Sequence, residues 1–300
     1  MTAASPFHGQ RFETLVRLAL EEDAVHRDVT TTTVVPASVR GVGKLMAKAD
    51  GVVAGLPLLR PESPLMRAFP TLAADILVED GAKVRKGDVL AVLRGNGREL
   101  LSAERTVLNF LQRMSGVATA TAAYVAAVGD AAARIQETRK TCPGWRDLDK
   151  YAVRIAGGLN HRIDLSTQVL IKENHLIFAG VERSPEAVRR AVAAARSALP
   201  AGMLLEVEVE TLEQFDAALD AAADIVLLDN MDAARHAEAV RRRNTRGSAA
   251  LLEASGGITL ETVRATALAG VDRISIGALT HSVKALDLSF DLYPERSPAG

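Results

Sequence analysis

The first part of the chain combines helical patterns with a β-rich centre. Apolar residues recur every three to four positions over residues 7–23 and 102–128, and this spacing predicts two amphipathic helices. A threonine run that ends at Pro36 predicts an extended, turn-rich segment after the first helix. We expect the second, longer helix to link the two halves of the chain.

Alternating apolar and polar positions predict strands between these helices. Residues 41–54 predict a hairpin that turns at Asp50-Gly51, and residues 74–94 predict further strands separated by glycine turns. Residues 55–69 predict a short helix broken by prolines. The stretch 78–95 is similar to half of a biotinyl or lipoyl type of β-sandwich, but it lacks the modifiable lysine motif of those carriers, so we expect a purely structural sandwich.

From residue 133 the pattern changes to strands that alternate with helices, which predicts a parallel sheet. Polar residues follow nearly every predicted strand. An α/β barrel builds its active site in this way, whereas an open doubly wound sheet gathers such residues at one switch point. We expect an open TIM-like α/β barrel, because six strands are predicted rather than eight. The predicted strands are 134–137, 168–172, 204–209, 224–228, 249–253 and 273–276, and the predicted helices are 146–156, 185–198, 211–221, 232–243 and 259–269.

Composition narrows the class of protein. Of the 300 residues, 48% are hydrophobic and 24% are charged, which is typical of a globular protein. A net charge of −1 argues against a general nucleic-acid binder, and no apolar run reaches the ~18 residues that span a membrane. The single cysteine, Cys142, excludes an internal disulfide and a cysteine-based zinc site. We expect a cytoplasmic protein.

Basic residues gather beside chain breakers in the middle of the chain. Arg139 and Lys140 precede a Cys-Pro-Gly turn, His161 and Arg162 follow a Gly-Gly pair, and Lys172 ends an apolar run. Surface cations more commonly lie on helix faces, so this placement at strand ends and turns predicts a pocket for a polyanion. A scatter of surface charge is the alternative.

Two glycine-containing turns follow the last predicted strands. Ser255, Gly256 and Gly257 precede a predicted helix, and Gly277 opens a second turn that contains His281. Glycine lets the backbone approach an anion closely, and the loops after the last strands of a barrel commonly bind phosphate. The turns therefore predict a phosphate site, and ordinary βα turns are the alternative.

Three acidic residues, Glu206, Glu208 and Asp229, lie on or just past strands that are otherwise apolar. Glu206 and Glu208 are two positions apart and therefore face the same side of their strand. Burying a carboxylate is costly unless it is paired or serves a ligand. In a cationic pocket these acids can bind a metal–phosphate or stabilise positive charge on a sugar. Salt bridges to the neighbouring basic residues are the structural alternative.

These motifs resemble those of one family. ETRKTCPGWRDLDKYAVRIAGGLNHR and LIKENH, followed by EVEVETLEQ, IVLLDN, EASGGIT and ISIGALTHS, are similar to segments of nicotinate-nucleotide pyrophosphorylase (carboxylating), also called quinolinate phosphoribosyltransferase. The resemblance includes EDAVHRDVTT and SAERTVLNFLQRMSG and runs through most of the chain. It implies a homodimer with an N-terminal α/β sandwich (residues 1–108), on which the tail 283–300 packs, and a C-terminal open α/β barrel (residues 109–282).

The resemblance also implies the reaction of a pentosyltransferase in NAD biosynthesis. The phosphoribosyl group of 5-phosphoribosyl 1-pyrophosphate (PRPP) would be transferred to quinolinate with Mg²⁺ as cofactor. The products would be nicotinate mononucleotide, pyrophosphate and CO₂. These substrates together carry two carboxylates, a pyrophosphate and a phosphate, which agrees with a basic pocket.

Roles for individual residues follow from the same resemblance. Arg139, His161 and Arg162 would hold the pyridine dicarboxylate, and Arg105 would reach the pocket from the partner subunit. Glu208 would face the ribose and its metal-bound pyrophosphate together with Asp229. The expected catalytic residues are Lys140, Lys172, Glu208 and Asp229, and the residues expected around phosphate are Ser255, Gly256, Gly277 and His281.

The chain departs from the family pattern at several positions. Glu137, Thr167 and Glu173 stand where the family usually has aspartate, and Asp164 stands where it usually has glycine. Asp164 would weaken binding of a dianionic acid if it faced the pocket, and would change nothing if it faced outward. We expect near-normal substrate placement. A relative that acts on another heterocyclic acid, or a non-catalytic dimer that binds phosphoribosyl ligands, remains an alternative.

Overall fold

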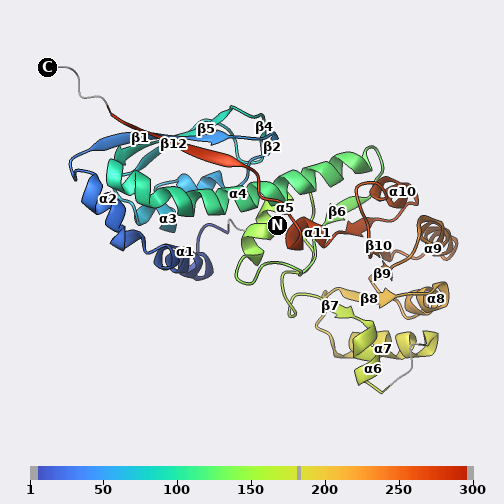
Figure 1. The fold of residues 1–300 in the computed structure, drawn as a ribbon. Coiled ribbons are helices and arrows are strands. Elements are labelled where there is room, and N and C mark those ends of the chain that lie inside the picture. Colours follow the sequence, from blue (N-terminus) through green and yellow to red (C-terminus); the bar gives the residue numbers. More distant parts are fainter. Residues whose placement is uncertain (1–5, 181–183, 296–300) are drawn as a thin grey trace. The chain divides into compact units, whose positions relative to one another are not determined.

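The chain divides into two compact units, and one long helix begins in the first and ends in the second. The computed structural model describes residues 6–180 and 184–295. The first unit contains the described residues up to Ala120, the segment Cys142–Ala156 and the described residues from Ser282 onward, and the second contains the rest. Helix α4 (Gly97–Val128) therefore begins in the first unit and ends in the second (Figure 1). The division into domains at residues 108 and 109 stays a prediction.

A four-stranded antiparallel sheet forms the framework of the first unit, in the order β12-β1-β5-β3. Burial alternates along β1, so one face of the strand is covered while the other is open. Helix α4 lies close to this sheet, because a Cβ atom on Gly41 of β1 would meet Leu100 of α4 at 3.0 Å. The strands of the unit are β1 (Arg40–Ala47), β2 (Gly51–Val52), β3 (Ala73–Ile76), β4 (Lys83–Val84), β5 (Val89–Asn96) and β12 (Leu288–Pro294).

The predicted hairpin over residues 41–54 is wrong. Strand β1 pairs with β5 on one side and with β12, from the other end of the chain, on the other side, while β2 pairs with β4. The Asp50-Gly51 turn is present, but the Asp50 carboxylate accepts a hydrogen bond from the backbone N–H of Lys86 at 2.8 Å. A local turn signal could not reveal that partners distant in sequence occupy both edges of β1.

The threonine run forms a helix, α2 (Val29–Val34), and not the extended segment that its composition predicts. Asp28 caps the helix by accepting a hydrogen bond from the Thr31 backbone N–H at 2.8 Å. Thr32 turns its hydroxyl back onto the Asp28 carbonyl at 2.7 Å, and Ser102 of α4 donates a hydrogen bond to the Asp28 carboxylate at 3.0 Å. The cap and its tertiary partner together override a weak local preference.

The remaining helices of the first unit include the predicted amphipathic helix near the N-terminus and the proline-broken pair. Segment Cys142–Ala156 joins this unit because its helix packs on α4. Asp149 is fully buried and accepts a hydrogen bond from Arg113 at 3.0 Å, and the Trp145 ring stacks on Phe110 with centroids 4.9 Å apart. These helices are α1 (Gln10–Glu22), η1 (Val25–Arg27), η2 (Leu56–Leu59), α3 (Pro64–Arg67) and α5 (Arg146–Ile155).

Six parallel strands form the second unit, in the spatial order β7-β8-β9-β10-β11-β6. Each strand from β7 to β11 lies beside the next strand in the chain, as in a barrel, whereas a doubly wound sheet reverses its order. Among the described residues β6 and β7 do not pair, so the barrel is open, as predicted. The strands are β6 (Arg134–Gln136), β7 (Val169–Ile171), β8 (Leu205–Val209), β9 (Ile225–Asp229), β10 (Leu251–Ser255) and β11 (Arg273–Ser275).

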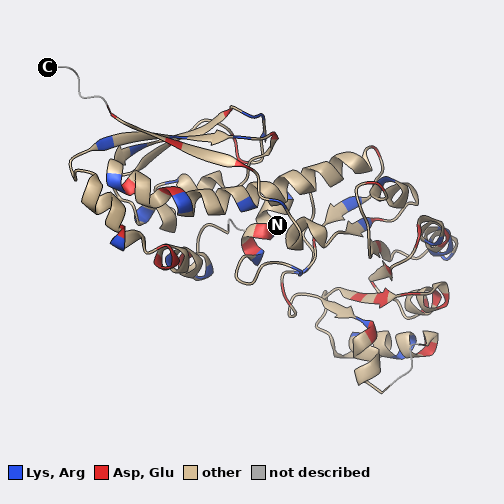
Figure 2. Ribbon diagram, in the orientation of Figure 1, with Lys and Arg blue, Asp and Glu red and all other residues tan. Residues whose placement is uncertain are grey.

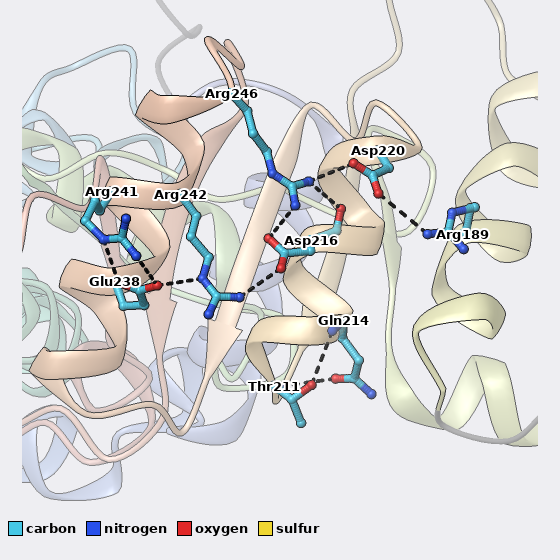
Figure 3. Close-up of polar contacts among 9 residues, drawn as sticks. All are labelled: Arg189, Thr211, Gln214, Asp216, Asp220, Glu238, Arg241, Arg242 and Arg246. Atoms are coloured by element: carbon cyan, nitrogen blue, oxygen red, sulfur yellow. Dashed lines mark hydrogen bonds and ion pairs between the residues drawn. The ribbon is translucent and has the colours of Figure 1, made fainter.

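Charges of both signs lie on the barrel helices, with only acidic charged side chains on α8 and mainly basic ones on α9 (Figure 2). Asp216 of α8 binds Arg242 of α9 at 2.8 Å and Arg246, the residue directly after α9, at 2.9 Å (Figure 3). Each such pair contributes up to about 1 kcal/mol, so the network aligns the helices more than it stabilises them. The helices are α6 (Glu173–Phe178), α7 (Pro185–Ala198), α8 (Leu212–Asp220), α9 (Ala233–Thr245), α10 (Val263–Leu268) and α11 (Ala278–His281).

In the described part of the chain, no helix combines the length and the apolar composition needed to cross a bilayer.

His236 on α9 makes stability depend on pH. Its side chain is buried, neither ring nitrogen has a hydrogen-bond partner among the described residues, and burial lowers the pKa of the imidazole below 6.5. The folded state therefore binds fewer protons than the unfolded state once the pH falls below about 6.5, and stability falls with it. We expect His236→Leu to raise stability by roughly 1 kcal/mol at pH 7.5, because an unsatisfied polar group is removed, and by more at pH 5.5. Urea unfolding at both pH values measures this, and an equal gain at both would contradict it.

Candidate active site

A cavity of about 790 Å³ lies at the C-terminal ends of the barrel strands, wholly within the second unit. Its walls come from the segments that follow successive strands, so residues far apart in the sequence meet in one place. This is the arrangement that polar residues after each predicted strand indicated. The expected site residues that line it are Arg139, Lys140, His161, Arg162, Lys172, Glu208, Asp229, Ser255, Gly256, Gly277 and His281.

Arg105 is the one expected site residue outside this set. It lies on α4 in the first unit, and its side chain is exposed. Its contribution from a partner subunit stays a prediction. Cys142 is exposed and is likewise absent from the cavity walls.

Two guanidinium groups share the basic side of the cavity. Arg139 and Arg162 both line the cavity, and burial first, and then the charge of Arg139, lower the pKa of the Arg162 guanidinium. Arg162 is held in position by a hydrogen bond from Nη1 to the Gln168 carbonyl at 2.9 Å. Like charges that are held close and partly desolvated repel each other unless an anion lies between them. This side of the cavity is therefore suited to a ligand with more than one negative charge.

The acidic side of the cavity faces Lys172. The Lys172 ammonium forms an ion pair with Glu208, so the structural alternative for the strand carboxylates is realised in part. Burial first, and then the Glu208 charge, raise the pKa of Asp229, which means that the two carboxylates lie near each other. Asn230 donates a hydrogen bond to Asp229 at 2.7 Å. Two neighbouring carboxylates with lone pairs left for a ligand are suited to a hard divalent cation.

The loops after β9 and β10 interlock at Gly256. This glycine has φ +95°, and a Cβ atom there would lie 2.2 Å from the Asn230 side-chain oxygen. The Asn230 backbone N–H also donates to the Ser255 carbonyl at 2.9 Å. A side chain at position 256 would therefore separate the Asp229 turn from the Ser255 turn.

Gly277 brings Lys140 and His281 together. A Cβ atom at this position would lie 3.0 Å from the His281 ring and 3.2 Å from the Lys140 side chain. The Thr280 hydroxyl donates to the Lys140 carbonyl at 2.8 Å and fixes that loop against α11. The second glycine turn thus positions a lysine from the opposite end of the barrel sequence.

The floor of the cavity contains an acid that the sequence analysis missed. Glu253, fully buried on β10, lines the cavity, and its Oε1 lies 3.5 Å from His161 Nε2, which is also 3.4 Å from Oε2 of buried Glu206. One signal in the sequence could have indicated Glu253. It lies in an apolar strand two positions before Ser255, and therefore on the same face.

The spacing of His161, Glu206 and Glu253 would also suit a metal ion, but the histidine tautomer argues against one. The Arg162 backbone N–H donates to His161 Nδ1 at 2.7 Å. Nδ1 therefore carries no proton, and a neutral imidazole must carry its proton on Nε2. A protonated Nε2 cannot ligate a metal, so this triad is a hydrogen-bonded cluster.

Two departures from the family pattern are explained by their contacts. Glu137 is fully buried, and its carboxylate accepts hydrogen bonds from the His161 backbone N–H and the Asn160 side chain, both at 3.1 Å. The longer acid thus supports the loop that presents His161. Asp164 is partly exposed, accepts hydrogen bonds from the Ser166 backbone N–H at 2.9 Å and the Ser166 hydroxyl at 2.8 Å, and does not line the cavity, although its charge acts on the Arg162 guanidinium. Its carboxylate is therefore held by Ser166, outside the cavity walls.

Comparisons with known proteins agree with this geometry. The family model "Quinolinate phosphoribosyl transferase, C-terminal domain" matches residues 117–291, and the N-terminal domain model of the same family matches residues 28–115. Nicotinate-nucleotide pyrophosphorylase (carboxylating) of Mycobacterium leprae is 44% identical over 92% of this chain and 95% of its own length. The probable enzyme of that name from Bacillus subtilis is 41% identical over 83% of this chain and 82% of its own. The crystal structure of NadC from Streptococcus pyogenes superposes with a TM-score of 0.87 at 35% identity, covering 99% of this chain and 100% of that one.

Proposed function

The chain belongs to the quinolinate phosphoribosyl transferase family, and from this we propose that its barrel cavity joins quinolinate to the phosphoribosyl group of PRPP. The reaction releases pyrophosphate and CO₂ and yields nicotinate mononucleotide for NAD biosynthesis. One observation carries the proposal. Arg139 and Arg162 line one cavity together with the carboxylates of Glu208 and Asp229. A dicarboxylic acid fits the first pair, and a sugar that gains positive charge fits the second.

The guanidinium groups bind and orient the acid. Arg139 and Arg162 can each form charge-assisted hydrogen bonds to a carboxylate, and a planar fork matches a planar carboxylate group. A pyridine held by both acid groups has a fixed direction for its ring nitrogen, which is the nucleophile. Holding the two reactants in this geometry removes much of the entropy that the reaction would otherwise lose.

The carboxylates act at the ribose. When pyrophosphate leaves C1 of the sugar, positive charge develops there, and Glu208 and Asp229 stabilise it electrostatically. The same two side chains would hold Mg²⁺, and their oxygen donors fit that ion. Mg²⁺ would neutralise charge on the departing pyrophosphate when it is bound. The ion pair with the Lys172 ammonium holds the Glu208 side chain in position at the cavity.

The glycine turns and the lysines complete the site. Backbone N–H groups at Gly256 and Gly277, with Ser255 and His281, surround the phosphate groups. Once the ring nitrogen is bonded to C1, the C2–carboxylate bond breaks, CO₂ departs and its electron pair stays on C2. The Lys140 and Lys172 ammonium groups stabilise the negative charge on C2 until a proton takes the place of CO₂ there.

The assembly and location of the protein belong to the same proposal. We place Arg105 of each subunit in the cavity of its partner, which makes the active form a homodimer in the cytoplasm. The guanidinium of Arg105 would add a third cation for the acid.

A turnover assay tests the function. Purified protein is mixed with quinolinate, PRPP and Mg²⁺, and nicotinate mononucleotide is followed by chromatography. We expect product only when all three components are present. No product from a folded protein that still binds PRPP would redirect the search to other heterocyclic acids.

The position of Asp164 outside the cavity walls, with its carboxylate bonded to Ser166, predicts a silent substitution. We expect Asp164→Gly to change the KM for quinolinate less than about twofold, because a screened surface charge contributes little. A thermal-shift titration with quinolinate should give the same midpoint for both proteins. A tenfold lower KM in the variant would mean that Asp164 faces the acid after all.

A further inference from the structure

Two buried acids at the floor of the cavity, Glu206 and Glu253, have few hydrogen-bond donors and no directly bonded cation within the described ranges of the chain. Glu206 and Glu253 are both fully buried, and the His161 Nε2–H lies between them at 3.4 and 3.5 Å. One N–H group can satisfy one carboxylate only. The other donors to the two acids are neutral: Gln136 and Ser275 donate to Glu253, and Gln168 donates to Glu206, each at 2.6 Å. Two adjacent buried carboxylates in such a setting do not both stay ionised near neutral pH.

Of these two carboxyl groups, Glu253 is the one that more readily holds a proton. Burial raises the pKa of Glu206 to about 7 as well, but the Arg162 and Lys172 charges act against this shift, so Glu206 has the stronger cationic support of the two acids. Glu253 faces the Glu206 charge from β8, the His161 ring, and Arg273 of β11 as its weakest influence. Burial first, and then Glu206, raise the pKa of Glu253 to about 7. The Ser275 hydroxyl can accept a proton from this carboxyl as well as donate to it, so the protonated form keeps its hydrogen bond.

His161 cannot take this proton in the arrangement observed. Its Nδ1 accepts the Arg162 backbone N–H at 2.7 Å, and an imidazolium would place a second N–H against that donor. The ring is therefore a neutral link between the cavity and the two acids.

Binding of a dianionic ligand shifts the protonation equilibrium of Glu253. In the free protein the Arg162 charge favours ionised acids beneath it. A carboxylate bound to Arg162 compensates that charge and adds negative charge of its own near His161, and in a partly desolvated site both effects favour a protonated Glu253.

We propose that binding of the dicarboxylic acid is coupled to uptake of one proton by Glu253, which makes Glu253 a positioning residue that acts through His161. This inference rests on the proposed function, since quinolinate is the acid in question. It predicts that quinolinate binds more weakly as the pH rises above neutrality. Between pH 6.5 and 8 we expect its KM to rise roughly threefold to tenfold, while the KM for PRPP changes less.

Isothermal titration calorimetry counts the proton directly. Quinolinate is titrated into the intact protein in two buffers of different ionisation enthalpy, at pH 6, 7 and 8. The acid stays ionised throughout, because carboxylic acids titrate near pH 4. We expect uptake near zero at pH 6, where Glu253 already holds its proton, and approaching one at pH 8. No proton uptake at any pH, with binding intact, would overturn the inference.

Glu253→Gln provides the decisive variant, because glutamine imitates the protonated carboxyl. We expect no proton uptake and a quinolinate KM at pH 8 that matches the wild-type KM at pH 6.5. The matched control is Glu186→Gln, which neutralises an exposed glutamate of α7. It should keep the wild-type proton count and pH profile. Uptake that persists in Glu253→Gln would assign the proton elsewhere and overturn the proposal.

The two possible failures are distinguishable. If quinolinate gives no binding signal with or without Mg²⁺ and pyrophosphate, the proposed function fails. If it binds without proton uptake, only the coupling fails. Should Glu253→Gln not fold, the wild-type proton count still decides, and Ser275→Ala gives a second variant. Loss of its hydroxyl removes a donor that favours the ionised carboxyl, so we expect the uptake to shift to higher pH.

Discussion

Replacing Arg162 by leucine is expected to lower kcat/KM for quinolinate by about 100- to 1,000-fold. Each charge-assisted hydrogen bond to a carboxylate contributes about 1.5–3 kcal/mol, and the loss of one forked pair therefore corresponds to about 3–4 kcal/mol. The loss should appear mainly in the KM for quinolinate, while the KM for PRPP changes little. Steady-state kinetics with each substrate varied in turn measures both.

The stability of the free variant separates this effect from damage to the fold. Removing Arg162 relieves its repulsion from Arg139, but it also removes the attraction to Glu206 and one hydrogen bond to Gln168, so the effects on stability oppose each other. We expect a melting temperature close to that of the wild type and no thermal shift with quinolinate. Arg162→Lys should be intermediate, because it keeps the charge but not the fork. The control Arg190→Gln removes an exposed arginine of α7 and should leave kinetics unchanged. A normal quinolinate KM in Arg162→Leu would remove this residue from the acid site.

Replacing Asp149 by alanine is expected to destabilise the protein by about 3–5 kcal/mol. Its carboxylate is fully buried and accepts a hydrogen bond from Arg113, whose side chain is 23% exposed and lies over the Trp145 ring. Truncating one partner leaves a partly buried cation without its anion. For a protein of this size the melting temperature should fall by very roughly 10 °C. Differential scanning calorimetry and urea unfolding both measure the loss.

A double substitution tests the physical reason. Burial raises the pKa of Asp149 despite the Arg113 charge, so the pair is not a net gain simply because it is an ion pair. We expect Arg113→Met combined with Asp149→Leu to recover much of the stability lost in Asp149→Ala, since replacing both partners by apolar groups removes the uncompensated charge. Asp149→Asn should lie between. Equal destabilisation in the double variant would point to packing of α5 on α4 instead of charge.

The hydrophobic periodicity and the turn residues were sufficient to predict most strands of the barrel from the sequence. The six strands lie where apolar runs predicted them, because each run is bounded by polar or glycine residues and buried on both faces. The alternation of strands and helices left a barrel and a doubly wound sheet open, and the polar residues after nearly every strand favoured the barrel. The short helices α6 and α11 were missed, because six and four residues are too few to show a helical period.

Local signals failed where distant partners decided the outcome. The Asp50-Gly51 turn suggested a hairpin, yet β1 pairs with β12 from the other end of the chain. The threonine run forms a helix because Asp28 caps it and Ser102 of α4 holds that cap. Segment Cys142–Ala156 lies between barrel strands in sequence but packs with the first unit, through Asp149 and its neighbours.

The sequence by itself determined the barrel, the basic cluster and the acids at strand ends, because residue type and period are local properties. Only the tertiary structure decided how these groups act on one another. It brought Arg139 and Arg162 into one cavity, paired Lys172 with Glu208 and bonded Asp164 to Ser166. It also put Glu253 beneath His161, where burial and a neighbouring charge, and not residue type, decide which group holds a proton.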